Sequence, residues 1–502
     1  MKHVIIIGSG LGGLSTGVLL AKNGYKVTVL EQGMQIGGCL QCFTRRGAKF
    51  ETGMHFIGSA DEGQTLQKMF RYLELTDDRV RLSRLDTQAY DIVSLAGEHF
   101  RFANGREPFI EQMASYFPKE KDNLCRYYDI VEKVASASSL HSLKHAETDN
   151  AINTEYQLRS IDDVISSIIT DPLLQNVLVG NLPLYAAEKG KTPFSTHAFI
   201  MDFYNQSAWR IAGGSDTIAH ALADTIRRYG GEVRTRCRVT NIMCDATHAI
   251  GVEVNDTIYI SSDYIISAIH PMRTLELLDM TKLIRPAFRN RINSMPQTAG
   301  GFTVYIHFKE NTVPYLNSNF YGYHSTTPWG CEHYTQAEWP KGYLYMHLCH
   351  EPSPRYAKTG VILSYMSWEE MEPWLGTHVG HRGADYEDFK RRKAERLIDA
   401  VEKDIPGLRD SIECYYTSTP LTYYDYTGTE HGSMYGVAKD INLGAACRVP
   451  QRTKVPNVLL TGQNINSHGM LGVLVGTIVT CSEFLTAEEI YRQIKDPHRL
   501  HL

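Results

Sequence analysis

The chain has 502 residues, enough for roughly three folding units at about 150 residues each. Its 51 basic and 56 acidic side chains give a net charge of −5, which argues against a nucleic-acid-binding protein, because such proteins carry a strong basic excess on the binding face. Ten cysteines are too few for a disulfide-stapled scaffold, and the apolar run at the N-terminus is short and has no cleavage site, so we expect a globular cytoplasmic protein.

The first 31 residues follow the pattern of a strand, a glycine-rich turn, a helix and a second strand. Residues 4–7 are a β-branched run typical of a buried parallel strand, and residues 26–30 form a second one. Between them a G-x-G-x-x-G turn opens an apolar helix, whose N-terminus can hold a pyrophosphate, while the acid after the second strand can bind a ribose. The pattern predicts a dinucleotide site formed by Gly8, Gly10, Leu11, Gly12, Gly13, Glu31 and Gln32.

The next segment favours FAD over a nicotinamide cofactor. A second glycine pair, Gly37-Gly38, follows Glu31 closely and would let the chain pass near the ribityl and pyrophosphate groups of FAD. A dehydrogenase that uses NAD alone has no need of this pair. Only one dinucleotide fingerprint is visible, so a nicotinamide electron donor would have to bind in another way or deliver electrons indirectly.

Two further blocks complete a resemblance to the FAD-dependent phytoene desaturase, carotenoid isomerase and retinol saturase superfamily, which shares its cofactor motifs with amine oxidases. The middle block, residues 209–269, has a Gly213-Gly214 turn, a helix and a hairpin, and the resemblance implies that the backbone of Val239 contacts the adenine. In the third block, a strand over residues 457–463 ends in Gly462-Gln463. The resemblance implies that Gln463, where many relatives carry Asp, bonds the ribityl chain. The resemblance further implies that the helix that follows opens against the flavin ring, with contacts from Gly469, Met470, Leu471, Gly472 and Val473.

The resemblance also implies a fold and a division of the chain. We expect an α/β protein in which a Rossmann-like FAD-binding domain of the glutathione-reductase or amine-oxidase type carries an α+β substrate cap, both discontinuous. The FAD-binding domain would comprise residues 1–60, 206–284 and 441–502, and the cap would comprise residues 61–205 and 285–440.

The implied function is FAD-dependent redox chemistry on carbon–carbon bonds of an apolar polyene or isoprenoid: desaturation, saturation or cis-trans isomerisation by hydride exchange with flavin N5. An electron donor or acceptor of unknown identity would be needed, and an apolar substrate suggests peripheral membrane contact. If a protein side chain moves a proton, the candidates are His55, Glu51, Tyr435 and His468, because they lie in the blocks expected around the flavin.

Two rivals share the fold. The 29 tyrosines are compatible with an amine-oxidase-type flavoenzyme, although the C-terminal Gly-Gln-Asn pattern argues against this alternative. A flavin-free escort protein for lipidated partners would be expected to lose the cofactor glycines, and here they are intact.

Four smaller features are given structural interpretations. Cys39 and Cys42 are interpreted as small buried residues of a strand near the cofactor, rather than as a redox pair or a flavin attachment point. No metal is assigned to residues 347–351, because strand alternation separates their side chains. Residues 390–393 are interpreted as a solvated helix face held by the pairs Glu387–Arg391 and Asp388–Arg392, and the tyrosine-rich loop over residues 419–436 as a wall of the flavin cavity.

Overall fold

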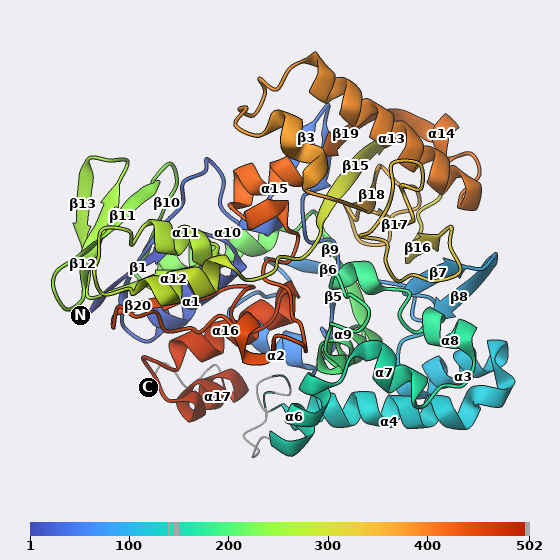
Figure 1. The fold of residues 1–502 in the computed structure, drawn as a ribbon, viewed down its shortest axis with the longest axis horizontal. Helices are drawn as coiled ribbons and strands as arrows, with labels where there is room; N and C mark the ends of the chain where they lie inside the picture. Colours follow the sequence, from blue (N-terminus) through green and yellow to red (C-terminus); the bar gives the residue numbers. More distant parts are fainter. Residues whose placement is uncertain (139–140, 142, 144–149, 497–502) are drawn as a thin grey trace.

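The computed structural model describes residues 1–138, 141, 143 and 150–496 (Figure 1). Its first large sheet has five strands in the order β10-β2-β1-β14-β20, and every pair in it is parallel. The strands come from three separate stretches of the chain: β1 (His3–Ile7), β2 (Lys26–Leu30), β10 (Glu232–Arg234), β14 (Tyr264–Ser267) and β20 (Val458–Leu460). The two ends of the chain and a middle segment therefore fold together.

Helix α1 (Leu11–Lys22) packs between α10 (Asp216–Arg228) and α16 (Gly469–Cys481). Because it has neighbours on both sides as well as the sheet, α1 is buried at every residue from Gly12 to Ala21, and it is apolar nearly all round. The few polar groups are paired: the hydroxyls of Ser15 and Thr477 lie 2.7 Å apart. This packing fixes the N-terminus of α1 beside the first turn of α16.

An antiparallel sheet of β11 (Val239–Cys244), β12 (Ala249–Val254) and β13 (Ile258–Ser261) lies beside the parallel sheet, at the left in Figure 1. Its inward side chains share an apolar core with β1, β14 and β20. Helices α11 (Pro271–Glu276) and α12 (Pro286–Asn293) follow, and the chain then leaves for the second region.

The second region is built on a mixed sheet of seven strands in the order β19-β15-β18-β17-β16-β7-β8. Its strands are β7 (Asp91–Leu95), β8 (Glu98–Phe102), β15 (Gly300–Phe308), β16 (Asn319–Tyr323), β17 (Gly342–His347), β18 (Thr359–Met366) and β19 (Ile412–Ser418). Side chains alternate between its faces. One face, with Tyr305, Tyr321 and Tyr365, belongs to the core shared with the parallel-sheet region, whereas the other packs against α13 (Ala384–Asp404).

Helices and small sheets fill the space around these two regions (Figure 1). A three-stranded sheet in the order β5-β9-β6 and the hairpin β3–β4 lie at the join. The remaining elements are β3 (Cys42–Arg45), β4 (Ala48–Glu51), β5 (Ile57–Gly58), α2 (Thr65–Tyr72), β6 (Arg81–Arg84), α3 (Arg106–Tyr116), α4 (Lys121–Ala137), α6 (Asn150–Leu158), α7 (Ile161–Ser166), α8 (Pro172–Val177), α9 (Phe194–Gln206), β9 (Ala208–Ala212), α14 (Leu408–Ser411), α15 (Pro420–Thr427) and α17 (Ala487–Lys495). The expected α/β fold is confirmed, while the domain boundaries stay a prediction.

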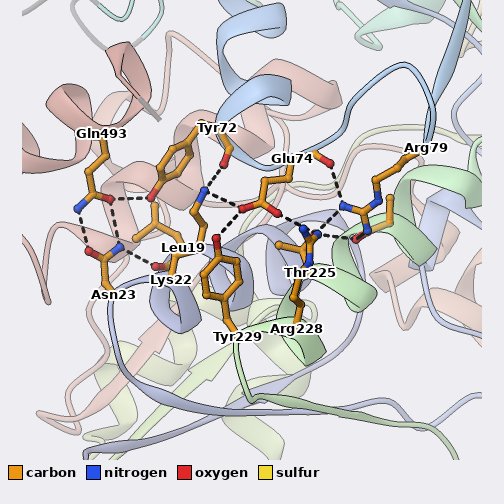
Figure 2. A network of polar contacts seen from close by, with 11 residues as sticks. Leu19, Lys22, Asn23, Tyr72, Glu74, Arg79, Thr225, Arg228, Tyr229 and Gln493 are labelled. Carbon is orange, nitrogen blue, oxygen red and sulfur yellow. Dashed lines mark hydrogen bonds and ion pairs between the residues drawn. The ribbon is translucent and has the colours of Figure 1, made fainter. Parts of the chain in front are cut away.

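A polar network at the C-terminal end of α1 ties four parts of the chain together (Figure 2). The side chain of Lys22 is only 2% exposed, and its Nζ donates to the backbone oxygen of Tyr72 at 2.7 Å and lies 3.3 Å from Glu74. Glu74 in turn accepts from the Tyr229 hydroxyl at 2.7 Å and pairs with Arg228 at 2.9 Å. The carboxylate thus joins α1 and the segment after α2 to the end of α10.

The same network reaches the C-terminal helix. Asn23 and Gln493 of α17 exchange side-chain hydrogen bonds at 3.2 and 2.8 Å, and the Tyr72 hydroxyl donates to Gln493 at 2.9 Å (Figure 2). The network therefore holds α17 against the C-terminal ends of α1 and α2.

Two local expectations are wrong. Lys393 is not solvated: its Nζ pairs with the partly buried Glu370 at 2.6 Å and lies over the Trp339 ring, because the face of α13 that carries it turns toward the sheet. Asp388 does pair with Arg392, but Glu387 pairs with Lys390 rather than with Arg391.

The tyrosine-rich segment is also more regular than a loop. It folds into α15 because Thr419 and Thr422 form a capping box, Pro420 stands at the first helical position, and Gly428 ends the helix with a φ of 67°. In the part of the chain that the structure describes, no helix is both long and apolar enough to cross a bilayer.

Candidate cofactor and substrate site

The cofactor glycines of both chain ends converge above the parallel sheet. A Cβ on Gly12 would lie 2.7 Å from the Gly462 Cα, and one on Gly13 would lie 2.1 Å from the Gly8 oxygen. The Gly37 N–H donates to the Ser9 oxygen at 3.0 Å, which places the Gly37-Gly38 pair directly over the first turn. The three predicted glycine motifs are therefore parts of one surface.

Open space remains where a dinucleotide would lie. A Cβ on Gly10 or on Gly469 would meet no atom within 4 Å, although the glycines next to Gly10 are tightly packed. Gly10 is the N-cap of α1 and Gly469 is the first residue of α16, so the backbone at both helix N-termini is open to approach. This arrangement fits the diphosphate and the ring system of FAD.

Glu31 lies at the end of β2, as the sequence predicts, but its carboxylate already has protein partners. One oxygen accepts from the Ser9 N–H at 3.0 Å and the Ser9 hydroxyl at 2.6 Å, and the other accepts from the Gly33 N–H at 2.8 Å. A carboxylate has lone pairs to spare, so it can accept from a ribose as well. Gln32 is exposed, and Val239 is buried at the start of β11.

The C-terminal block places a turn and a helix at the same surface. Gly462 has a φ of 99°, and half-buried Gln463 follows it. Met470, Leu471 and Val473 are buried on α16, whereas Gly472 packs against Ser467, where a Cβ would come within 2.7 Å. Of these residues, Gly469 at the start of α16 is the one that borders open space.

His55 and Glu51 form a buried pair. The His55 Nδ1 lies 3.3 Å from a Glu51 oxygen, and both side chains are at most 9% exposed. Burial raises the pKa of Glu51, and the neighbouring His55 and Arg210 oppose this shift. The side chain of Arg210 is fully buried and donates to the His55 backbone oxygen at 3.4 Å. Sequence reasoning missed Arg210, although an arginine inside a buried strand pattern was the available signal.

Tyr435 and His468 form a second pair, on the side of α16. Their rings lie 4.4 Å apart, centre to centre, and the Tyr435 hydroxyl donates to the Pro183 oxygen at 2.9 Å. Burial and the charge of Lys439 lower the pKa of His468 to about 4. No hydrogen bond joins this pair to His55 and Glu51 within the residues that the structure describes, so the four candidates form two separate pairs.

Cys42 begins β3, but Cys39 lies in the short 3₁₀ helix Gly38–Leu40 and not in a strand, because the left-handed Gly37 and Gly38 turn the chain there. Burial raises the pKa of the Cys39 thiol to about 11 and that of Cys42 to about 12. Such thiols are poor nucleophiles at neutral pH.

A cleft of about 600 Å³ opens between the seven-stranded sheet and the loops that face it. Glu332 and Glu369 stand among its lining residues, and its wall also includes Thr298, whose hydroxyl accepts from the Tyr435 N–H at 3.1 Å. The cleft thus borders the Tyr435 segment. The lining residues are Ala186, Ala187, Glu188, Gln297, Thr298, Ala299, Gly300, Glu332, His333, Tyr334, Tyr365, Ser367, Trp368, Glu369 and His431.

Known proteins match the chain along nearly its whole length. The all-trans-retinol 13,14-reductase of Rattus norvegicus is 28% identical to it, over 98% of this chain and 86% of its own length. The chloroplastic prolycopene isomerase 1 of an Oncidium hybrid cultivar is 24% identical, over 93% of this chain and 78% of its own. A crystal structure of an oxidoreductase from Methanosarcina mazei has the same fold, with a TM-score of 0.64 at 15% identity over 96% of this chain and 100% of that one.

These relatives confirm the resemblance inferred from the sequence. A family model described as flavin containing amine oxidoreductase matches residues 11–476, a range that includes the glycine surface and α16. The chain therefore belongs to the flavin-containing amine oxidoreductase family and is an FAD-dependent oxidoreductase.

Proposed function

We propose that the chain exchanges a hydride with a carbon–carbon bond of an apolar polyene or isoprenoid. The observation that carries this proposal is the composition of the wall opposite the cofactor surface. Strands β15, β16, β17 and β18 contain no Asp, Glu, Lys or Arg, and the face that they turn toward the cofactor region carries tyrosines and aliphatic side chains. These four strands offer no counter-ion to a charged substrate, whereas a polyene can pack against them; Glu188, Glu332 and Glu369 line the adjoining cleft.

Bound FAD supplies the hydride acceptor or donor. The glycine turns would hold its diphosphate, Glu31 would accept a hydrogen bond from a ribose, and the N-terminus of α16 would lie beside the ring. The sheet wall orients the substrate and excludes water. Saturation adds a hydride and a proton, desaturation removes both, and isomerisation leaves the composition unchanged.

The relatives support the substrate class, because two of them are named for all-trans-retinol and prolycopene, both conjugated polyenes. The test is anaerobic incubation of the holoprotein with matched polyenes, once with oxidised and once with reduced flavin, followed by chromatography and mass measurement. We expect a product that differs by two hydrogens or in double-bond geometry. Turnover of amines with no polyene product in either condition would instead favour the amine-oxidase interpretation.

We further propose that any proton moves through one of the two buried pairs, His55–Glu51 or Tyr435–His468. Both pairs lie on segments that border the cofactor surface, and burial gives Glu51 a raised pKa, which suits a proton donor. The variants Glu51→Gln, His55→Gln, Tyr435→Phe and His468→Gln test this idea, with FAD content as the control for folding. Full activity in all four would remove it.

We infer that the substrate reaches the cleft from a membrane surface. Leu375, Val379 and Tyr426 are 45%, 50% and 60% exposed, and an ion pair between Arg382 and Asp425 links the loop that carries the first two to α15. Tyr424 of α15 lies against Trp368 of the cleft wall, so the helix that carries Tyr426 adjoins the cleft. Binding to zwitterionic liposomes in a flotation assay, weakened in Tyr426→Ser, is expected. No flotation with neutral or anionic vesicles would contradict the idea.

A further inference from the structure

The cleft that adjoins the apolar wall is acidic. Among the described residues that line it are three carboxylates, Glu188, Glu332 and Glu369, and no lysine or arginine. One oxygen each of Glu188 and Glu332 and a ring nitrogen of His333 all lie within 4.8 Å of one another, so two of the three acids meet at one point of the lining. This point repels an anionic group, whereas a hydrogen-bond donor can bind to it.

Glu332 is largely buried and has no basic side chain as a partner. Its side chain is 14% exposed, and the charged group that lies nearest to its carboxylate, within the part of the chain that the structure describes, is the His333 ring at 3.6 Å. Glu188 differs, because Lys191 pairs with it at 2.5 Å and offsets its charge. A carboxylate that is removed from water without a donor keeps a desolvation cost, which a donor on a ligand would reduce.

Contacts join the cleft to the apolar wall and to the cofactor surface. Tyr365 of β18 lines the cleft and also belongs to the face that packs toward the cofactor region. Thr298 lines the cleft too, and its hydroxyl accepts from the N–H of Tyr435, whose ring lies 4.4 Å from that of His468 at the N-cap of α16. A long substrate that packs on the wall can therefore keep one end in the cleft.

We propose that the cleft binds the polar end of the substrate, and that Glu332 makes it select an end that donates a hydrogen bond, such as a hydroxyl group, over a carboxylate. The inference rests on the proposed function, because it concerns one end of a polyene whose chain packs on the sheet. Trp368 and Tyr334 also line the cleft, so the carbon atoms next to the donor keep apolar contacts. A hydrocarbon without a polar end would leave the Glu332 carboxylate without a donor.

Three ligands with one polyene skeleton test the selection: all-trans-retinol, its methyl ether and the corresponding carboxylic acid. The alcohol donates a hydrogen bond, the ether only accepts one, and the acid is anionic at neutral pH. Dissociation constants are measured on the FAD-loaded protein by quenching of tryptophan emission, which requires no turnover. Glu332→Gln removes the charge and keeps the shape. Glu413→Gln, the matched control, removes an exposed charge on β19 that does not line the cleft.

The unmodified protein and Glu413→Gln are expected to bind the alcohol about tenfold more tightly than the ether or the acid. In Glu332→Gln the acid should bind more tightly than before, so that its affinity comes within about threefold of that of the alcohol. FAD content reports the folding of each variant. If Glu332→Gln does not retain FAD, Glu188→Gln is measured in its place, with the same expectation for the acid.

Equal affinities of the unmodified protein for the alcohol, the ether and the acid would overturn this inference and leave the proposed function standing. A preference for the alcohol over the acid that is unchanged in Glu332→Gln would do the same, because another group would then make the selection. Binding of none of the three ligands to the unmodified protein would overturn the inference together with the proposed function.

Discussion

The backbone of Gly462 lies so close to Gly12 that a methyl group on Gly12 would meet the Gly462 Cα at 2.7 Å and its nitrogen at 2.9 Å. These residues stand 450 positions apart, in the first helix of the chain and after its last strand. Their contact brings the N-terminus of α1 and that of α16 to one surface, which is what allows a single extended cofactor to touch both.

Gly12→Ala is therefore expected to disturb both the fold and the cofactor. The added methyl group would meet the backbone of Gly462, which cannot rotate out of the way as a side chain could. We therefore expect overpacking to reduce the free energy of unfolding by about 1–3 kcal/mol. Purified protein should carry little FAD, as measured by the ratio of flavin to protein absorbance. A variant with full FAD content would show that the two helices are not held in this contact.

Gly10→Ala should separate the two effects. Its methyl group would point into open space, and the residue has no left-handed backbone to strain. We expect the melting temperature of the apoprotein to stay unchanged while the dissociation constant for FAD rises at least about tenfold, because the methyl group occupies the approach of the diphosphate. Equal FAD affinity in titrations of the two apoproteins would place the diphosphate elsewhere.

Lys22→Met tests the network of Figure 2. The substitution removes a buried ammonium that donates to the backbone oxygen of Tyr72 and pairs with Glu74. Glu74 keeps its ion pair with Arg228 and its hydrogen bond from Tyr229. Urea unfolding should show a loss of about 1–3 kcal/mol, with an unchanged flavin spectrum. Lys26→Met, at an exposed position of β2, is the matched control and should unfold as the unmodified protein does. An equal loss of stability in Lys26→Met would mean that the effect comes from the change in net charge and not from the lost contacts of Lys22.

Asp91 should make the protein less stable as the pH rises. It is fully buried in β7 and accepts from the Asn319 side chain, and burial raises its pKa to about 7 from an ordinary value of 3.8. Between these two values the folded protein holds a proton that the unfolded chain has released, so the free energy of unfolding falls as pH increases through that window.

Asp91→Asn removes that titration and keeps an oxygen for the bond from Asn319. Denaturant unfolding at several pH values should show a flatter profile between pH 4 and 7 than the unmodified protein has, with the variant at least as stable at pH 8. Parallel profiles for the two proteins would mean that Asp91 is ionised in the folded state.

The sequence predicts the glycine turns and the helix and strands that flank them because their signals are local. Glycines at fixed offsets after a strand, as in residues 8–13 and 37–38, reflect backbone constraints that short segments carry by themselves, and the structure brings these motifs together. Contacts that depend on tertiary packing leave no comparable pattern in the sequence. The pairing of Lys393 with Glu370 depends on which face of α13 turns toward the sheet.

The two buried pairs show the same limit. His55 and Glu51 are four residues apart, so their contact could be suspected from the sequence. Tyr435 and His468 meet only because the segment over residues 435–439 packs along the loop before α16, and no sequence pattern indicates that pairing.

The most direct test of the account is the visible spectrum of the purified protein, followed by identification of the nucleotide released on heating. The account requires the absorption bands of oxidised flavin and the release of free FAD. A colourless protein that takes up no FAD would contradict it, and flavin that stays with the denatured chain would instead indicate a covalent bond at Cys39 or Cys42.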